Sequence, residues 1–183
     1  MILLSGAGIW KQANVSFNLE FVHAPIKIPY DPVNGDNKLD SSVTGFPVAG
    51  IELRKIMDTT VPSSERAFDG RPLDGSIHVY YVKELTEIDW GGFSLGYLGY
   101  VFMPDIANTY PNILAHEVGH ALGLDHNADG CSKTTNACTT NPYGLNPNDS
   151  ELTDRTSLMW WLTYKYNWHL TPAHWKRLIA RHR

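Results

Sequence analysis

Residues 116 to 126 read HEVGHALGLDH, and this stretch decides which fold the rest of the chain must support. On a helix, positions four apart share a face, so His116 and His120 direct their imidazoles to one point, with Glu117 beside it. Gly123 permits a sharp turn with positive φ that brings His126 back to the same point. Three converging imidazoles are a ligand set for zinc, so the stretch predicts a helix, a turn and a metal site.

The same spacing predicts a reaction. Three neutral imidazoles leave the fourth zinc position for a water molecule, whose pKa the ion lowers to about 7. Glu117 can accept the proton of this water, and the resulting hydroxide can attack a carbonyl group that the ion polarises. Hydrolysis of a peptide bond is the expected outcome. A bare HExxH pattern arises by chance, but Gly123 and His126 at two further positions make chance a poor explanation.

Two other interpretations of this stretch stay open. The helix can be an amphipathic core helix with polar residues at its edge, although the apolar residues opposite the histidines fit that interpretation poorly. Alternatively, a downstream glutamate can replace His126 as the third ligand, and Glu151 is the nearest candidate. Gly123 and His126 in register favour the histidine.

The extended pattern HExxHxxGxxH resembles the metzincin clan of zinc peptidases, and all five of its defining positions are matched here. The resemblance implies an α+β fold with a twisted mixed sheet and the active-site helix above a cleft, and an irregular lower subdomain ending in a helix. It also implies one catalytic domain over residues 1–183, divided near residue 126 into upper and lower parts. Met159 in SLMW, 159 − 126 = 33 positions after His126, fits the methionine of the tight turn beneath the metal.

The resemblance further implies where a substrate binds. In such enzymes an exposed edge strand above the cleft pairs with an extended polypeptide, and we assign this role to Leu98, Gly99, Tyr100 and Val101. The aromatic run after Met159 corresponds to the pocket wall, with Trp161 and Tyr164 as lining candidates, although such residues also form cores. Tyr164 and His169 are alternative donors to the oxyanion.

Two positions depart from the familiar branches of the clan. Asn127 follows the third histidine, where several groups have Asp, Glu or Pro. Trp161 occupies the position where some groups place a tyrosine ligand. The branch is therefore unassigned.

Apolar periodicity and capping residues predict the other elements. Residues 5–14 suit a short helix, and the alternating apolar residues from Val15 to Phe21 suit a half-buried strand. Strands are predicted over residues 76–85 and 98–103. A final helix is opened by Thr171 as cap and Pro172 in its first turn.

Composition excludes some classes of partner. A net charge of −4 and a sequence pI of about 6.0 provide no basic field for nucleic acid, and the basic residues near the end, such as Arg177, are too few to change this. No apolar run is long enough to span a bilayer, and the opening MILLSGAGIW lacks the features of a signal peptide. We therefore expect either a piece of a larger polypeptide or export by a route without a cleaved signal.

Two polar segments have alternative interpretations. Cys131 and Cys138 suit a disulfide, which would persist only outside a reducing cytoplasm, and the alternative is two inert thiols. The acidic stretch between residues 29 and 47 offers possible calcium ligands, but it lacks the helix-loop-helix spacing and also suits a plain loop. Its oxygen donors are Asp31, Asn34, Asp36 and Asp40.

The sequence therefore predicts a monomeric zinc endopeptidase that acts on extended polypeptides outside the cytoplasm. A toxin or effector domain delivered by a secretion apparatus is one setting that fits the missing signal and the cysteine pair. The alternatives are a non-catalytic peptide-binding module that keeps the zinc fold, and a zinc amidase that acts on cell-wall peptides. The four remaining histidines have no partner pattern and are treated as non-functional: His23, His78, His174 and His182.

Overall fold

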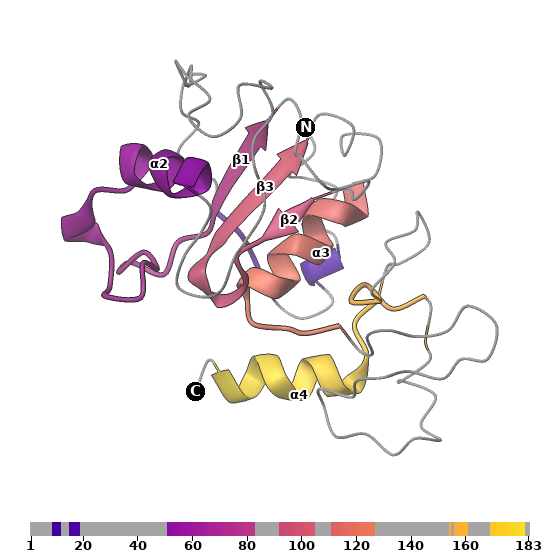
Figure 1. Cartoon of the computed structure of the whole chain (residues 1–183). Coiled ribbons are helices and arrows are strands. Elements are labelled where there is room, and N and C mark those ends of the chain that lie inside the picture. The colour runs from indigo at the N-terminus through magenta and orange to yellow at the C-terminus, as the bar shows by residue number, and fades with distance from the viewer. Residues whose placement is uncertain are drawn as a thin grey trace.

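The computed structural model describes residues 9–11, 15–18, 51–82, 92–104, 111–126, 154, 156–160 and 169–181 (Figure 1). The architecture is α+β, as predicted, with a small mixed sheet and a few helices. In chain order the elements are α2 (Ile51–Thr60), the 3-10 helix η1 (Ser63–Glu65), β1 (His78–Val82), β2 (Phe93–Ser94), the 3-10 helix η2 (Gly96–Leu98), β3 (Tyr100–Pro104), α3 (Pro111–Ala121) and α4 (Pro172–Arg181).

The three described strands form a mixed sheet in the order β1-β3-β2. Strand β1 runs parallel to β3, with His78 opposite Tyr100. Strand β2 runs antiparallel to β3, with Phe93 opposite Phe102. Strand β3 is therefore the central strand, and its residues are buried from end to end. This burial explains its continuous apolar sequence, because a strand covered on both faces needs no polar alternation.

Helices cover both faces of the sheet (Figure 1). Side chains alternate between the two faces along a strand, so Val101 and Met103 join the core that contains α3, whereas Tyr100 and Phe102 join the core that contains α2. The core on the α3 side also contains Met159 and Leu178 from the last third of the chain. Helix α3, which carries His116 and His120, is thereby fixed between the sheet and the C-terminal segments.

The predicted edge strand at residues 98–101 is wrong in its position. Leu98 lies in η2, and Gly99 ends that turn with a φ of 78° in the left-handed region. Tyr100 and Val101 begin β3, which is paired on both sides by β1 and β2. A strand with both edges already hydrogen-bonded cannot add a substrate strand. The apolar and aromatic residues of this segment indicated a strand correctly, but they carry no information about strand order.

Other boundaries differ in smaller ways. Residues 15–18 are described without strand structure, so that part of the predicted strand from Val15 is wrong, while residues 9–11 are helical as expected. Strand β1 begins two residues later than predicted, and α4 begins at Pro172 as predicted. Helix α2 had no predicted counterpart. None of the helices in the described ranges is long and apolar enough to cross a membrane.

The C-terminal part joins the core through two short segments. Residues 156–160 form a turn, and Ser157 makes an isolated parallel bridge with His169. The Leu158 N–H donates to the His169 carbonyl at 2.7 Å. At the start of α4, the Thr171 N–H donates to Nδ1 of the buried His174 at 3.1 Å, which satisfies a group that would otherwise lack a partner at the helix end.

Candidate metal centre

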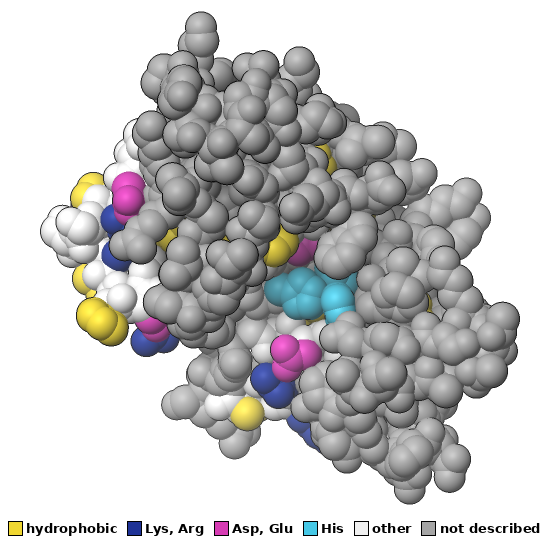
Figure 2. Space-filling view, viewed as in Figure 1, with side chains coloured by type: hydrophobic (Ala, Val, Ile, Leu, Met, Phe, Trp, Pro, Cys, Tyr) yellow, Lys and Arg dark blue, Asp and Glu magenta, His cyan; other side chains and the backbone are white. Residues whose placement is uncertain are grey.

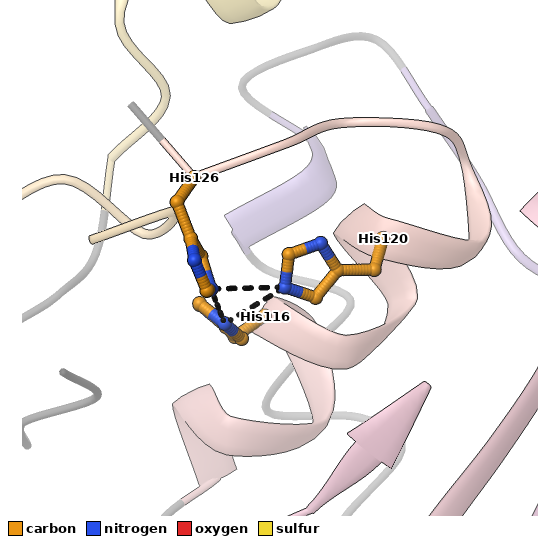
Figure 3. A group of neighbouring side chains, drawn as sticks. All are labelled: His116, His120 and His126. Carbon is orange, nitrogen blue, oxygen red and sulfur yellow. Dashed lines mark hydrogen bonds between the residues drawn. The ribbon is translucent and has the colours of Figure 1, made fainter. Parts of the chain in front are cut away.

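The three predicted ligands converge in the structure. His116 and His120 lie one turn apart on α3, and His126 lies five residues beyond its end (Figure 3). Their Nε2 atoms are 3.2 Å apart for His116 and His120, 3.1 Å for His120 and His126, and 3.2 Å for His126 and His116. These side chains form a group that can hold a metal ion.

The return of His126 has a local cause at the end of α3. Gly123 adopts a φ of 82°, and its N–H donates to the His120 carbonyl at 2.8 Å. The Leu124 N–H donates to the Gly119 carbonyl at 2.9 Å. This pair of bonds is the Schellman pattern, which ends a helix by reversing the chain at a left-handed residue. The buried Leu124 anchors the reversal, and His126 follows it back over the helix.

Backbone carbonyls set the tautomers of the two helical histidines. Nδ1 of His116 lies 2.6 Å from the Leu158 carbonyl, and Nδ1 of His120 lies 2.8 Å from the Leu124 carbonyl. A carbonyl only accepts, so both Nδ1 atoms carry the proton. In neutral rings the two Nε2 atoms then carry lone pairs that face each other, and no hydrogen bond between them is available. The two lone pairs repel each other, and a metal cation bound between the nitrogens would accept both of them.

The spacing of the nitrogens fits zinc. Zn–N bonds of about 2.0–2.1 Å in tetrahedral geometry place ligand nitrogens about 3.3 Å apart. The observed separations of 3.1 to 3.2 Å are close to this value. Burial, followed by the neighbouring His120 and His126, lowers the pKa of His116 well below its ordinary value. His116 is therefore neutral at physiological pH, as a ligand must be.

Glu117 is buried beside this group on α3. Burial raises its pKa to about 8. The segment that leads into β2 packs directly on this side chain, because a Cβ added at Gly92 would lie 2.9 Å from the Glu117 Cγ. At position 92, only glycine leaves room for the Cγ methylene group of Glu117.

Met159 lies in the turn beneath α3. It is fully buried, and its sulfur packs against Gly119, where any Cβ would collide with it. The preceding residue, Leu158, supplies the carbonyl that holds His116. The turn is therefore attached to the metal-motif helix by a packing contact and by a hydrogen bond.

The group opens to the surface on one side. His116 is buried, whereas His120 and His126 are partly exposed. Figure 2 shows histidine side chains at the surface, in the middle of the visible face. A metal ion held here would remain accessible to a substrate from that side.

Several predicted residues lie outside the described part of the chain. They include the four calcium candidates, both cysteines, Glu151, Asn127, Trp161 and Tyr164. His169 is described, and its Nε2 lies 2.7 Å from an Asp154 carboxylate oxygen. His78 bonds to Ser76 at 2.9 Å and stacks with Tyr80, and His174 accepts from the Thr171 N–H, so both histidines have contacts that support the fold.

Three features of the site were missing from the predictions. Two are the carbonyl groups of Leu124 and Leu158, which carry no side-chain signal. The third is Arg177 on α4, whose guanidinium contacts the turn between Gly123 and His126. Only its place in the predicted final helix, among the basic residues near the end of the sequence, was visible beforehand.

Comparison with known proteins agrees with a peptidase. Residues 76–146, less than half of the chain, match the family model described as Peptidase M66. The matched segment contains β1 to α3 and all three histidines. No solved structure matches the chain.

Proposed function

We propose that this chain is a zinc-dependent endopeptidase of the metzincin type. The observation that carries the proposal is the convergence of three histidine Nε2 atoms at zinc-like spacing on a segment that matches a peptidase family. His116, His120 and His126 would hold the ion. When bound, zinc supplies Lewis acidity, which lowers the pKa of water and polarises a carbonyl group.

Glu117 is the group that moves protons in this proposal. Its position on the ligand helix, one residue from His116, suits a general base that takes a proton from the attacking water. The same carboxyl group can then deliver the proton to the departing amide nitrogen. Burial favours the neutral form of Glu117, and a nearby cation would favour the carboxylate, so the two effects oppose each other at its carboxyl group.

An extended polypeptide is the proposed substrate, and β2 replaces residues 98–101 as the strand that would pair with it. Within the described sheet, β2 is paired only with β3, so its other side is an edge. Gly92, which leads into β2, packs against Glu117. A peptide that pairs with this edge would therefore run close to the proposed base.

The test is zinc content together with cleavage of a diverse peptide library by the purified chain. We expect one zinc per chain and cleavage by the wild type. Glu117→Gln should retain zinc and lose about a hundredfold or more in turnover, because general-base catalysis contributes factors of this order. His126→Ala should lose zinc affinity.

The remaining outcomes separate the alternatives. A wild type that binds zinc and cuts no peptide would indicate a peptide-binding module. Release of peptides from cell-wall sacculi without cleavage of linear peptides would indicate an amidase. Full zinc affinity in His126→Ala would reject the three-histidine site.

We also propose that the chain acts outside the cytoplasm as a monomer, and that it is carried there as part of a larger polypeptide or by a secretion apparatus. The support is the pair Cys131 and Cys138, which suits a disulfide that would persist only outside a reducing cytoplasm. Peptide mapping without reduction tests the disulfide, and recovery of both cysteines as free thiols from periplasmic expression would contradict it. The toxin or effector role stays a prediction.

A further inference from the structure

Arg177 connects α4 to the turn that carries the third histidine. Its Nε donates to the Gly123 carbonyl at 3.2 Å, and its Nη2 lies 2.9 Å from an Asp125 carboxylate oxygen. The two partners flank Leu124, and Asp125 immediately precedes His126. Acidic and basic side chains lie side by side just below the histidines on the same face (Figure 2).

The three histidines are held in different ways. His116 and His120 are fixed by α3 and by carbonyl partners at their Nδ1 atoms. His126 lies beyond the helix, and its position depends on the course of the chain after Gly123. A change in that course moves His126 most directly, and it also moves the Leu124 carbonyl that holds His120.

The backbone of helix α4, which carries Arg177, is anchored by contacts of its own. Its first turn is closed by the bonds between Thr171 and His174, and Leu178, next to Arg177, is buried in the same core as α3. The Trp175 indole donates to the Leu170 carbonyl at 3.2 Å, which fixes the entry to the helix. The guanidinium therefore reaches the turn from a backbone that is itself anchored.

We propose that Arg177 is a positioning residue that holds the Gly123–Asp125 turn so that His126 completes the metal site. The inference rests on the proposed function, because it assumes that the three histidines bind zinc. Arg177 touches neither the metal nor the substrate in this proposal. It acts through the backbone of Gly123 and the carboxylate of Asp125.

Arginine suits this role better than lysine. Its planar guanidinium presents donors in a fixed fork, so one side chain binds a carbonyl and a carboxylate at the same time. The Arg177 and Asp125 side chains are 34% and 49% exposed, and an ion pair this exposed adds little to stability by itself. The geometric restraint on the turn is therefore the larger effect.

The sign of one measurement separates this role from a simple charge effect. A cation near a divalent metal weakens metal binding by repulsion, so removal of Arg177 through charge alone would tighten zinc binding. Removal of a positioning contact would weaken zinc binding. Loss of the guanidinium should therefore act in opposite directions under the two explanations.

The experiment measures the zinc dissociation constant of the whole chain by competition with a chromophoric chelator. Arg177→Gln should bind zinc about tenfold more weakly, the usual size for loss of an outer contact to a metal ligand. Lys176→Gln is the matched control, because it removes the same charge from the exposed neighbouring position, and it should bind like the wild type. Arg177→Lys should also weaken zinc binding, because lysine lacks the planar donor fork of arginine. This variant carries the test if circular dichroism shows that Arg177→Gln folds poorly.

A double-mutant cycle tests the route through His126. In a His126→Ala background, Arg177→Gln should cause a smaller loss of zinc affinity than in the wild type, since the ligand that it positions most directly is gone. Unchanged or tighter binding by Arg177→Gln, or the same loss in both backgrounds, would overturn the proposal. Failure of the wild type to bind zinc would instead contradict the proposed function, so the two failures are distinguishable.

Discussion

At the scale of single residues, Gly119 shows how packing constrains a position that helix propensity alone would fill differently. It lies inside α3, where alanine normally stabilises a helix by about 1 kcal/mol relative to glycine. A Cβ here would collide with the sulfur of Met159. The Met159 side chain therefore occupies the space that a Cβ at position 119 would need.

We expect Gly119→Ala to destabilise the chain. Overpacking a filled core costs about 1–3 kcal/mol, which outweighs the gain in helix propensity. Urea unfolding in the presence of a chelator measures the free energy of unfolding without the contribution of a metal. In a Met159→Ala background the same substitution should become stabilising, and an unchanged sign there would show that Met159 is not the obstacle.

At the scale of elements, the turn at residues 156–160 and the entry to α4 are joined by side chains as well as by backbone. Asp154 accepts from the Thr156 N–H at 2.9 Å and from the Thr156 hydroxyl at 2.7 Å. Its other oxygen lies 2.7 Å from Nε2 of His169. This network holds the segment whose Leu158 carbonyl binds His116.

The network predicts a pH dependence of stability. Desolvation acts to raise the pKa of Asp154, but the hydrogen bonds from Thr156, together with the hydrogen bond and charge of His169, outweigh it, so the pKa lies below its ordinary value of 3.8. A carboxyl group with a lowered folded pKa stabilises the fold above its unfolded pKa, and this contribution is lost as pH falls through the folded value.

We therefore expect the wild type to be more stable than Asp154→Asn near neutral pH. The difference should be a few tenths to about 1 kcal/mol, because the pair is partly exposed. It should shrink as pH falls below 3.8. Urea unfolding of both chains with a chelator across this range measures the difference. A gap that stays constant down to pH 3 would show that the ionised carboxylate is not its source.

At the scale of the whole molecule, the proposed metal site lies where separate parts of the chain meet. Helix α3 packs on the sheet through one core, and His116 is bonded to the turn at Leu158. The turn bearing His126 is in turn bonded to α4 through Arg177. Metal binding to the folded form should therefore stabilise the chain as a unit.

We expect zinc to raise the melting temperature. A ligand at a hundred times its dissociation constant contributes about 2.7 kcal/mol, which corresponds to about 5–10 °C for a domain of this size. Differential scanning calorimetry with zinc and after chelation measures the shift. His126→Ala should lose most of it, and an equal shift in that variant would place the stabilising ion elsewhere.

The local parts of the site were predictable because their determinants lie close together in the sequence. The spacing of His116 and His120, followed by Gly123 and His126, determined a helix, a left-handed reversal and a converging ligand set. The start of α4 was predictable for the same reason, since its cap and first-turn proline are adjacent. Helix-end geometry depends on a few neighbouring residues.

Strand order, tautomers and the anchoring of the turn were decided only by the tertiary structure. The apolar residues around Tyr100 predicted a strand, but only the pairing with β1 and β2 made it the central strand of the described sheet. Leu158 and Arg177 lie 42 and 54 residues from the groups they hold, His116 and Gly123. Contacts across such separations leave no periodic pattern in the sequence, because they depend on how whole elements pack. HEVGHALGLDH therefore determined by itself which residues converge, while the folded chain determined what holds them in place.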